Sequence, residues 1–146
     1  MSISASPLPT ALARAVEETR SRLEDGTDKA SAWVERVQTD SMDSDRCAIC
    51  QRRDDQLQEH HVAGKNNSGL TIPACLLCHA RLSERQNGWD PRWQLKDSPP
   101  LLRETFLFRG LSDLCKERAR HFGPSYRELG KRLLATYANR ARETIP

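Results

Sequence analysis

Apolar residues near the N-terminus recur at three- and four-residue steps, which is the spacing of an amphipathic helix. The first helical pattern starts at about Thr10, after nine Ser- and Pro-rich residues that we expect to be disordered. Gly26 interrupts this pattern, a second short one follows, and the polar residues 40–46 are typical of a linker. The apolar positions are Leu12, Ala15, Val16 and Leu23 in the first pattern, and Ala30, Trp33, Val34 and Val37 in the second.

Short apolar runs in the middle of the chain predict two strands and one helix. A first short strand ends where residues 61–63 reach Gly64, a turn residue, and residues 65–69 have the composition of a loop. Residues 70–73 predict a second strand, with Pro73 at its end or at an edge. From Cys75 onward the pattern is helical and stops near Asn87 and Gly88. The predicted order is therefore strand, loop, strand, helix.

Two further helices are expected in the C-terminal part. We predict that Ser98 caps the first of them, with proline in its first turn, and that Ser125 and Glu128 form a capping box at the start of the second. Between the central helix and these two lie Trp89 and Trp93. Such a pair fills the side of a small core more often than it stacks on nucleic-acid bases.

The elements together predict an α+β fold that is mostly helical. At 146 residues, of which 37% are hydrophobic, the chain fits one domain with a modest core supported by metal. We divide it into helices and linker at 10–46, a central module at 47–95 and helices at 96–146. The chain shows neither a secretory signal nor a membrane-spanning apolar run, so we expect a cytoplasmic protein.

The formal net charge of +3 is unevenly distributed along the chain. Residues 1–46 have 6 basic and 9 acidic side chains (−3), residues 47–95 have 6 and 5 (+1), and residues 96–146 have 11 and 6 (+5). A basic C-terminal part after a metal module favours binding to a phosphate backbone. The alternative is that Arg-rich helix faces are simply solvated.

Two Cys-x-x-Cys pairs carry the strongest chemical signal. Cys47 and Cys50 form the first pair and Cys75 and Cys78 the second, with 75 − 50 − 1 = 24 residues between them. Each short turn places two sulfurs on the same side of the backbone, so four thiolates can bind one tetrahedral Zn²⁺. We predict a structural zinc site. The fifth cysteine, Cys115, has no partner at ligand spacing and is expected to be a small buried hydrophobe.

Together with the histidines, these cysteines resemble a known family. The chain has Cys-x-x-Cys, then His60-His61-Val-Ala-Gly-Lys65, then Leu-Thr-Ile-Pro-x-Cys-x-x-Cys-His79. This combination is similar to the zinc-bearing HNH endonucleases, whose ββα-metal core (the His-Me finger) has the strand–loop–strand–helix order predicted above. The resemblance covers residues 47–86, about a quarter of the chain.

The resemblance implies a nuclease that hydrolyses DNA phosphodiester bonds. His61 lies where the family has its general base, while His60 and His79 lie where it binds a divalent ion. An imidazole has an ordinary pKa of about 6.5 and can therefore accept a proton from water at neutral pH. Lys65 and the Arg-rich C-terminal helices would contact DNA phosphates without reading sequence. Since two imidazoles favour softer ions, we expect Mn²⁺, Ni²⁺, Co²⁺ or Zn²⁺ to bind at least as well as Mg²⁺.

One position departs from the family pattern. The usual asparagine lies about five residues before the third cysteine, where this chain has Leu70. Asn67, or its neighbour Asn66, is the candidate for this role of orienting the loop or the base.

Two other functions remain open. The histidines can instead belong to a catalytically inactive, zinc-stabilised DNA-binding or adaptor module. A third possibility is a protein-interaction module that uses the acidic N-terminal helices as a docking arm. The oligomeric state and the form of the DNA substrate are not encoded in these patterns.

Overall fold

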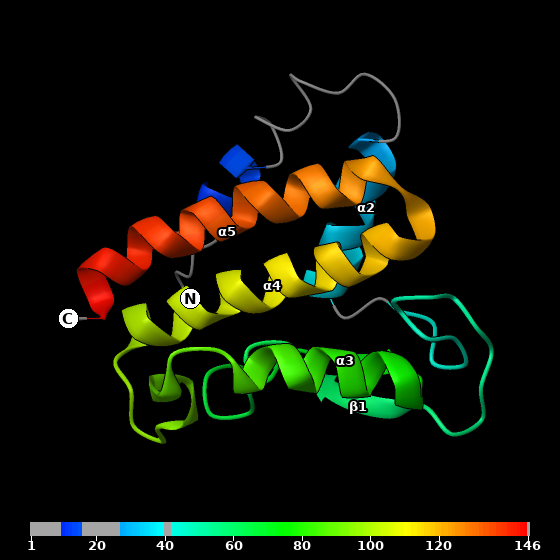
Figure 1. Ribbon diagram of the computed structural model, residues 1–146, viewed down its shortest axis with the longest axis horizontal. Helices are drawn as coiled ribbons and strands as arrows, with labels where there is room; N and C mark the ends of the chain where they lie inside the picture. The colour runs from blue at the N-terminus through cyan, green and yellow to red at the C-terminus, as the bar shows by residue number, and fades with distance from the viewer. Residues whose placement is uncertain (1–9, 16–26, 40–41, 146) are drawn as a thin grey trace.

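The computed structural model describes residues 10–15, 27–39 and 42–145, and it is mostly helical with one small antiparallel sheet. Three predictions fall on residues outside these ranges. They are the disorder of residues 1–9, the helical positions Val16 and Leu23, and the break at Gly26. Residues 10–15 are helical. The remaining elements are α2 (Thr27–Gln38), β1 (Gln58–His61), β2 (Thr71–Ala74), α3 (Leu76–Asn87), the 3₁₀ helix η1 (Pro91–Gln94), α4 (Pro100–Phe122) and α5 (Pro124–Thr144) (Figure 1).

The long helices α4 and α5 form an antiparallel hairpin that makes up one layer of the molecule. The turn between them is at Gly123, whose φ of 102° is in the region that favours glycine. Small residues allow a close crossing, since a Cβ at Gly130 would lie 3.2 Å from the Cβ of Cys115. The buried hydroxyl of Ser112 donates a hydrogen bond of 2.8 Å to the carbonyl of Gly130. Helix α2 packs against α5.

The starts of both long helices differ from the predicted ones. Helix α4 has Pro99 as its N-cap instead of Ser98, whose buried hydroxyl has no hydrogen-bond partner among the described residues. Helix α5 has Gly123 as its N-cap and Pro124 as its first residue, so the predicted capping box at Ser125 is wrong. The physical reason is the same at both sites. Proline has a φ suited to the first helical turn and no N–H to satisfy, so the helix begins around the proline.

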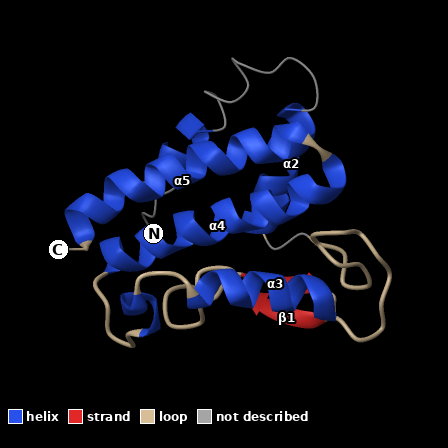
Figure 2. Ribbon diagram, in the orientation of Figure 1, coloured by secondary structure: helices blue, strands red, loops and turns tan. Residues whose placement is uncertain are grey.

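The second layer contains the two-stranded sheet and α3, joined by long loops (Figure 2). The strands pair with His60 opposite Ile72 and His61 opposite Thr71. Strand β2 begins at Thr71 and ends at Ala74, one residue later than predicted, whereas α3 ends at Asn87 as predicted. Helix α3 contacts both strands as well as α4. No helix in the described ranges is long and apolar enough to cross a membrane.

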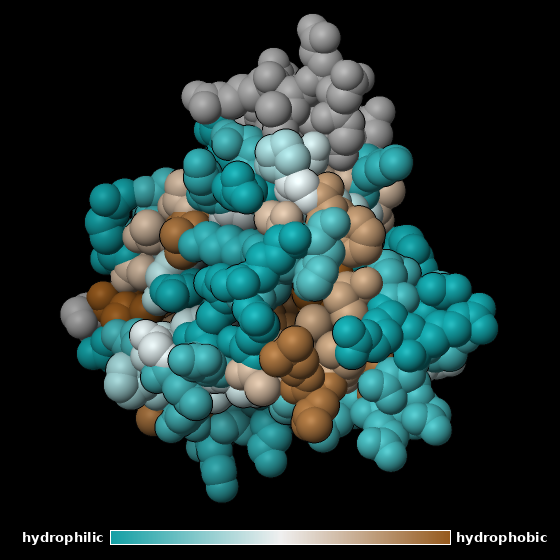
Figure 3. All heavy atoms as spheres, turned by 45° about the vertical axis from the view of Figure 1, so that its right-hand side comes forward, coloured by the Kyte–Doolittle hydropathy of each residue, from teal (hydrophilic) through white to brown (hydrophobic). Residues whose placement is uncertain are grey.

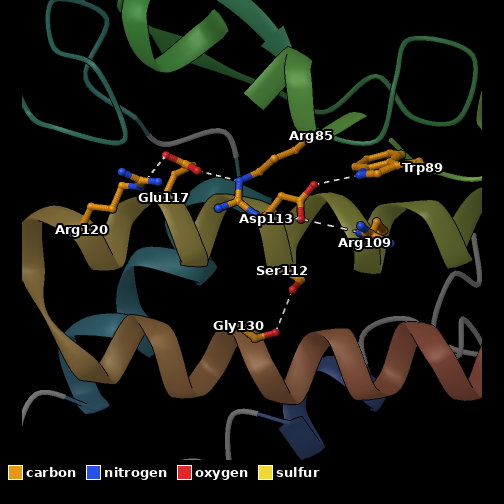
Figure 4. A network of polar contacts seen from close by, with 8 residues as sticks. All are labelled: Arg85, Trp89, Arg109, Ser112, Asp113, Glu117, Arg120 and Gly130. Atoms are coloured by element: carbon orange, nitrogen blue, oxygen red, sulfur yellow. Dashed lines mark hydrogen bonds and ion pairs between the residues drawn. The ribbon is translucent and has the colours of Figure 1, made fainter. Parts of the chain in front are cut away.

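A buried polar network joins α3 to α4 (Figure 4). Arg85 Nε donates a hydrogen bond of 2.6 Å to Glu117 Oε2, and Trp89 Nε1 donates one of 2.8 Å to Asp113 Oδ2. Both carboxylates are almost fully buried, and burial raises the pKa of Asp113. Buried carboxylates are tolerated only when charged and polar groups satisfy them. The network therefore fixes the orientation of α3 relative to α4.

The tryptophan pair has the core role that its spacing favoured. The Trp89 ring is buried and stacks on Phe106, with ring centres 6.0 Å apart and planes at 7°. Trp93 is half-buried and meets Trp89 edge-on at 5.7 Å. The expected burial of Cys115 is also confirmed, and burial raises the pKa of this thiol to about 12.

A single buried arginine connects the helical layer to the first Cys-x-x-Cys turn. Arg118, in α4, donates a hydrogen bond of 2.6 Å from Nη1 to the carbonyl of Ala48, which lies between the first two cysteines. Its guanidinium lies 4.7 Å from the ring centre of Trp33, 4.3 Å from that of Phe122 and 5.1 Å from that of Tyr126. Cation–π contacts with three aromatic rings compensate in part for burying the charge.

Candidate metal centre and histidine pair

The four cysteines of the two Cys-x-x-Cys pairs come together in one cluster. Their Sγ atoms all lie within 4.8 Å of one another, and the Sγ atoms of Cys50 and Cys75 are 3.9 Å apart. Tetrahedral zinc with Zn–S bonds of about 2.3 Å requires sulfurs about 3.8 Å apart. The cluster thus has the size and the donor set of a structural zinc site, as the spacing predicted.

Backbone hydrogen bonds shape the turn that carries the first pair. The N–H of Gln51 donates to the carbonyl of Cys47 at 2.9 Å, and the N–H of Cys47 donates to Arg52 at 2.9 Å. Gln51 has a φ of 66°, the left-handed conformation that closes this tight turn. The N–H of Ala48 donates to the carbonyl of Pro73 at 2.8 Å, which attaches the turn to β2. The second pair follows β2 directly, so the sheet brings both pairs to the same point.

The four thiols strongly affect one another's protonation. A hydrogen bond from the Cys78 side chain lowers the pKa of Cys47 to about 4, and the same contact raises the pKa of Cys78. Negative charge on one sulfur therefore opposes ionisation of its neighbours. A divalent cation removes this conflict, because all four sulfurs bind it as thiolates. The donor set fits a cation better than it fits four free thiols.

The second group of interest is the pair His60 and His79. His60 is in β1 and His79 is in the first turn of α3, and their rings meet at 5.5 Å between centres with planes at 84°. Two imidazoles that share a tetrahedral ion at about 2.0–2.1 Å from each nitrogen have ring centres about 5 Å apart. The spacing is therefore compatible with a shared ion. Burial first, and then the neighbouring His79 and His61, lower the pKa of His60 to about 4, which leaves it neutral at pH 7.

The lowered pKa of His60 predicts how the stability of the protein depends on pH. His60 has a lower pKa in the folded protein than the ordinary 6.5, so the unfolded chain binds more protons between these values and stability falls as the pH is lowered. Between about pH 7 and about pH 5 we expect the wild type to lose about 2 kcal/mol more unfolding free energy than His60→Gln. Urea unfolding with one equivalent of zinc measures this difference.

The matched control is His121→Gln, since His121 is exposed. This variant should keep the full pH dependence of the wild type, because it leaves the buried His60 unchanged. Equal pH dependence in the wild type and in His60→Gln would contradict the assigned shift.

His61 lies at the end of β1 and is half-buried. Its Nδ1 atom is shielded from solvent and has no hydrogen-bond partner among the described residues. An unpaired buried nitrogen costs free energy, so such atoms are often places where a ligand or water completes the bonding. The backbone of His61 is held from α3, because Gln86 Nε2 donates to its carbonyl at 2.8 Å.

The asparagines of the loop hold its backbone. Asn67 Nδ2 donates to the carbonyl of Ala63 at 2.8 Å and to that of Trp93 at 2.9 Å, while Asn66 Nδ2 donates to Gln94 at 3.0 Å. Both asparagines therefore tie the loop after β1 to the segment around η1. Lys65 lies in the same loop and is exposed.

Two residues that sequence reasoning did not select also position His61. Gln86 lies seven residues after His79, two helical turns further along the same face of α3, and this spacing was a usable signal. Gly110 gave no local signal. A Cβ at this position would lie 1.9 Å from the carbonyl oxygen of Val62, so only glycine lets α4 approach the residue that follows His61.

The described residues contain one group of three or more histidine, cysteine or acidic side chains at metal-binding distance, and it is the cysteine cluster. The histidine pair is therefore a two-ligand arrangement in this structure. Glu59, in the same strand, is exposed and accepts a hydrogen bond of 3.3 Å from Thr71.

No protein-family model, curated protein or solved structure matches the chain.

Proposed function

We propose that the protein is a metal-dependent endonuclease of the HNH type that hydrolyses phosphodiester bonds in DNA. One observation carries the proposal. The rings of His60, from a strand, and His79, from a helix, have centres 5.5 Å apart. The next residue along the strand, His61, has an Nδ1 atom without a hydrogen-bond partner among the described residues, and the four-cysteine cluster lies in the same module. The same residues carry the resemblance to the ββα-metal core in the sequence.

Each residue has a distinct task in the proposed reaction. The imidazole of His61 accepts a proton from the attacking water, and the oxygen of that water forms the new bond to phosphorus as the bond to the leaving oxygen breaks. His60 and His79 would hold the divalent ion, which when bound neutralises charge on the scissile phosphate. Gln86 and Asn67 hold the backbone around His61, and the exposed Lys65 contacts the DNA backbone.

The test is cleavage of supercoiled plasmid by zinc-loaded protein with added Mn²⁺, compared with Mg²⁺, Ni²⁺ and Co²⁺. We expect His61→Ala to reduce the rate by about a hundredfold to ten-thousandfold, because a general base contributes that much. His121→Ala, which removes an exposed histidine, should cleave like the wild type. The proposal fails if the wild type does not cut with any of these ions, or if His61→Ala cuts as fast as the wild type.

A second candidate function is a zinc-stabilised DNA-binding module without catalysis. It is favoured by the histidine pair having no third histidine, cysteine or acidic side chain at metal-binding distance among the described residues. Retention of DNA at low salt by a wild type that does not cleave, with a steep loss of binding as salt rises, would support this candidate.

A further inference from the structure

A small pocket opens on the solvent side of the cysteine cluster, with a volume of about 160 Å³. Cys50, Cys75 and Cys78 line it, whereas the fully buried Cys47 does not, so the pocket extends from the cluster on the side away from Cys47. The space is far larger than a metal ion and comparable to one large apolar side chain. Its wall is formed by Cys50, Arg52, Cys75, Leu77, Cys78, Arg81, Arg120 and His121.

The charges around the pocket restrict what it can bind. Its lining contains three arginines and a histidine, and no acidic residue. Cys50, Cys75 and Cys78 are part of the lining, and four thiolates around a divalent ion would carry a net negative charge. This charge would repel a phosphate that lies against the cysteines, whereas it would not repel an uncharged apolar group. Carboxylates can pair with Arg52 and Arg81, which also line the pocket.

Exposed leucines adjoin the pocket at the start of α3. Leu76 is 67% exposed and Leu77 is 58% exposed, and Leu77 forms part of the wall. In Figure 3 the molecule is turned so that the right-hand side of Figure 1 comes forward. This view shows a small apolar patch within a largely hydrophilic surface. Adjacent exposed leucines within a polar surround are typical of a protein-binding surface and have no use in binding a nucleic-acid backbone.

The pocket and the histidine pair are on different sides of α3. Successive residues of a helix are rotated by about 100°, so Leu77 and His79 point about 200° apart. Occupation of the pocket therefore does not cover His79.

We propose that this pocket, with the exposed Leu76 and Leu77, docks an acidic segment of a partner protein. One apolar side chain of the partner enters the pocket beside Leu77, and flanking Asp or Glu side chains pair with Arg52 and Arg81, since Arg120 already pairs with Glu117 at 3.2 Å. Such a site would recruit the protein to its place of action and does not depend on whether the histidines are catalytic.

Selection from a random peptide library displayed on phage, against the full-length zinc-loaded protein, tests the proposal. We expect enriched peptides to combine an apolar residue with neighbouring Asp or Glu. Synthetic copies should bind the wild type at least about tenfold more tightly than they bind Leu77→Ser or Arg81→Gln. Leu95→Ser and Arg127→Gln are the matched controls, because both residues are exposed and do not line the pocket.

Zinc content and circular dichroism of each variant establish that it is folded, which the exposure of Leu77 favours. The proposal is overturned if no acidic-apolar peptide is enriched, or if the pocket variants bind such peptides as tightly as the controls. It is also overturned if the same variants instead lose affinity for a short DNA duplex, which would make this face a nucleic-acid contact. Unchanged peptide binding by His61→Ala would support a docking site independent of catalysis.

Discussion

Cys78→Ser is expected to abolish tight zinc binding and to unfold the layer that contains the sheet and α3. The buried Cys78 belongs to a cluster that joins the turn at residues 47–50 to the start of α3. Structural zinc contributes about 10–16 kcal/mol to the folding of small modules, whereas whole domains are stable by about 5–15 kcal/mol. Loss of the ion therefore exceeds what the remaining core of this layer can compensate.

Zinc content by mass spectrometry and thermal unfolding followed by circular dichroism measure this effect. Part of the helical signal should remain, because α4 and α5 pack mainly against each other. Cys115→Ala is the matched control, since Cys115 is buried in the helical layer, outside the cluster, and its replacement should leave the zinc content unchanged. If a strong chelator strips the wild type of zinc without changing its thermal unfolding, the cluster has no structural role.

Gly110→Ala is the second substitution for which we expect a large loss of stability. Alanine is the better helix former by about 1 kcal/mol, so an unobstructed site in the middle of α4 would gain from the change. Here the new methyl group would lie 1.9 Å from the carbonyl oxygen and 2.7 Å from the carbonyl carbon of Val62. Backbone atoms cannot rotate away as a side chain can. We expect a net loss of about 3 kcal/mol or more in unfolding free energy, as α4 separates from the residues after β1.

Two other glycines make this result interpretable. Gly69→Ala should be nearly neutral, because no atom lies within 4 Å of the new methyl group. Gly130→Ala should have an intermediate cost, because its closest contacts, at 3.2–3.3 Å, include the side chains of Cys115 and Lys116, which can adjust. Urea unfolding of the three variants gives the order. A stability of Gly110→Ala close to that of the wild type would mean that α4 does not press against Val62.

Both predictions concern the support of His61 and not the histidine itself. The cysteine cluster fixes the turn that precedes the sheet, and Gly110 sets how closely α4 covers the residue after His61. Gln86 reaches the His61 carbonyl from α3, and the network around Asp113 and Glu117 holds α3 on α4. Displacement of either layer would therefore move His61 at the end of β1 and the loop that carries Lys65 and Asn67.

Local chemistry accounts for the parts of the fold that sequence reasoning predicted well. The Cys-x-x-Cys spacing needs only two short turns to present four sulfurs, and the cluster is present as predicted. The end of α3 at Asn87 follows from Gly88, a local stop signal. Helix starts were predicted less well because two signals competed. Ser98 and Ser125 are good caps in isolation, but the prolines next to them determined where the helices begin.

The sequence by itself determined the four-cysteine site, the strand–loop–strand–helix order, and the presence of three histidines within it. Each of these depends on residue type and on spacing along the chain. Only the tertiary structure decided that His60 lies against His79, that Arg118 is buried among three aromatic rings beside the first cysteine turn, and that Gly110 has no room for a side chain. It also decided that a basic pocket and exposed leucines lie beside the cysteines. These contacts join residues far apart in the chain, and their distances depend on how the two layers pack, which no local pattern records.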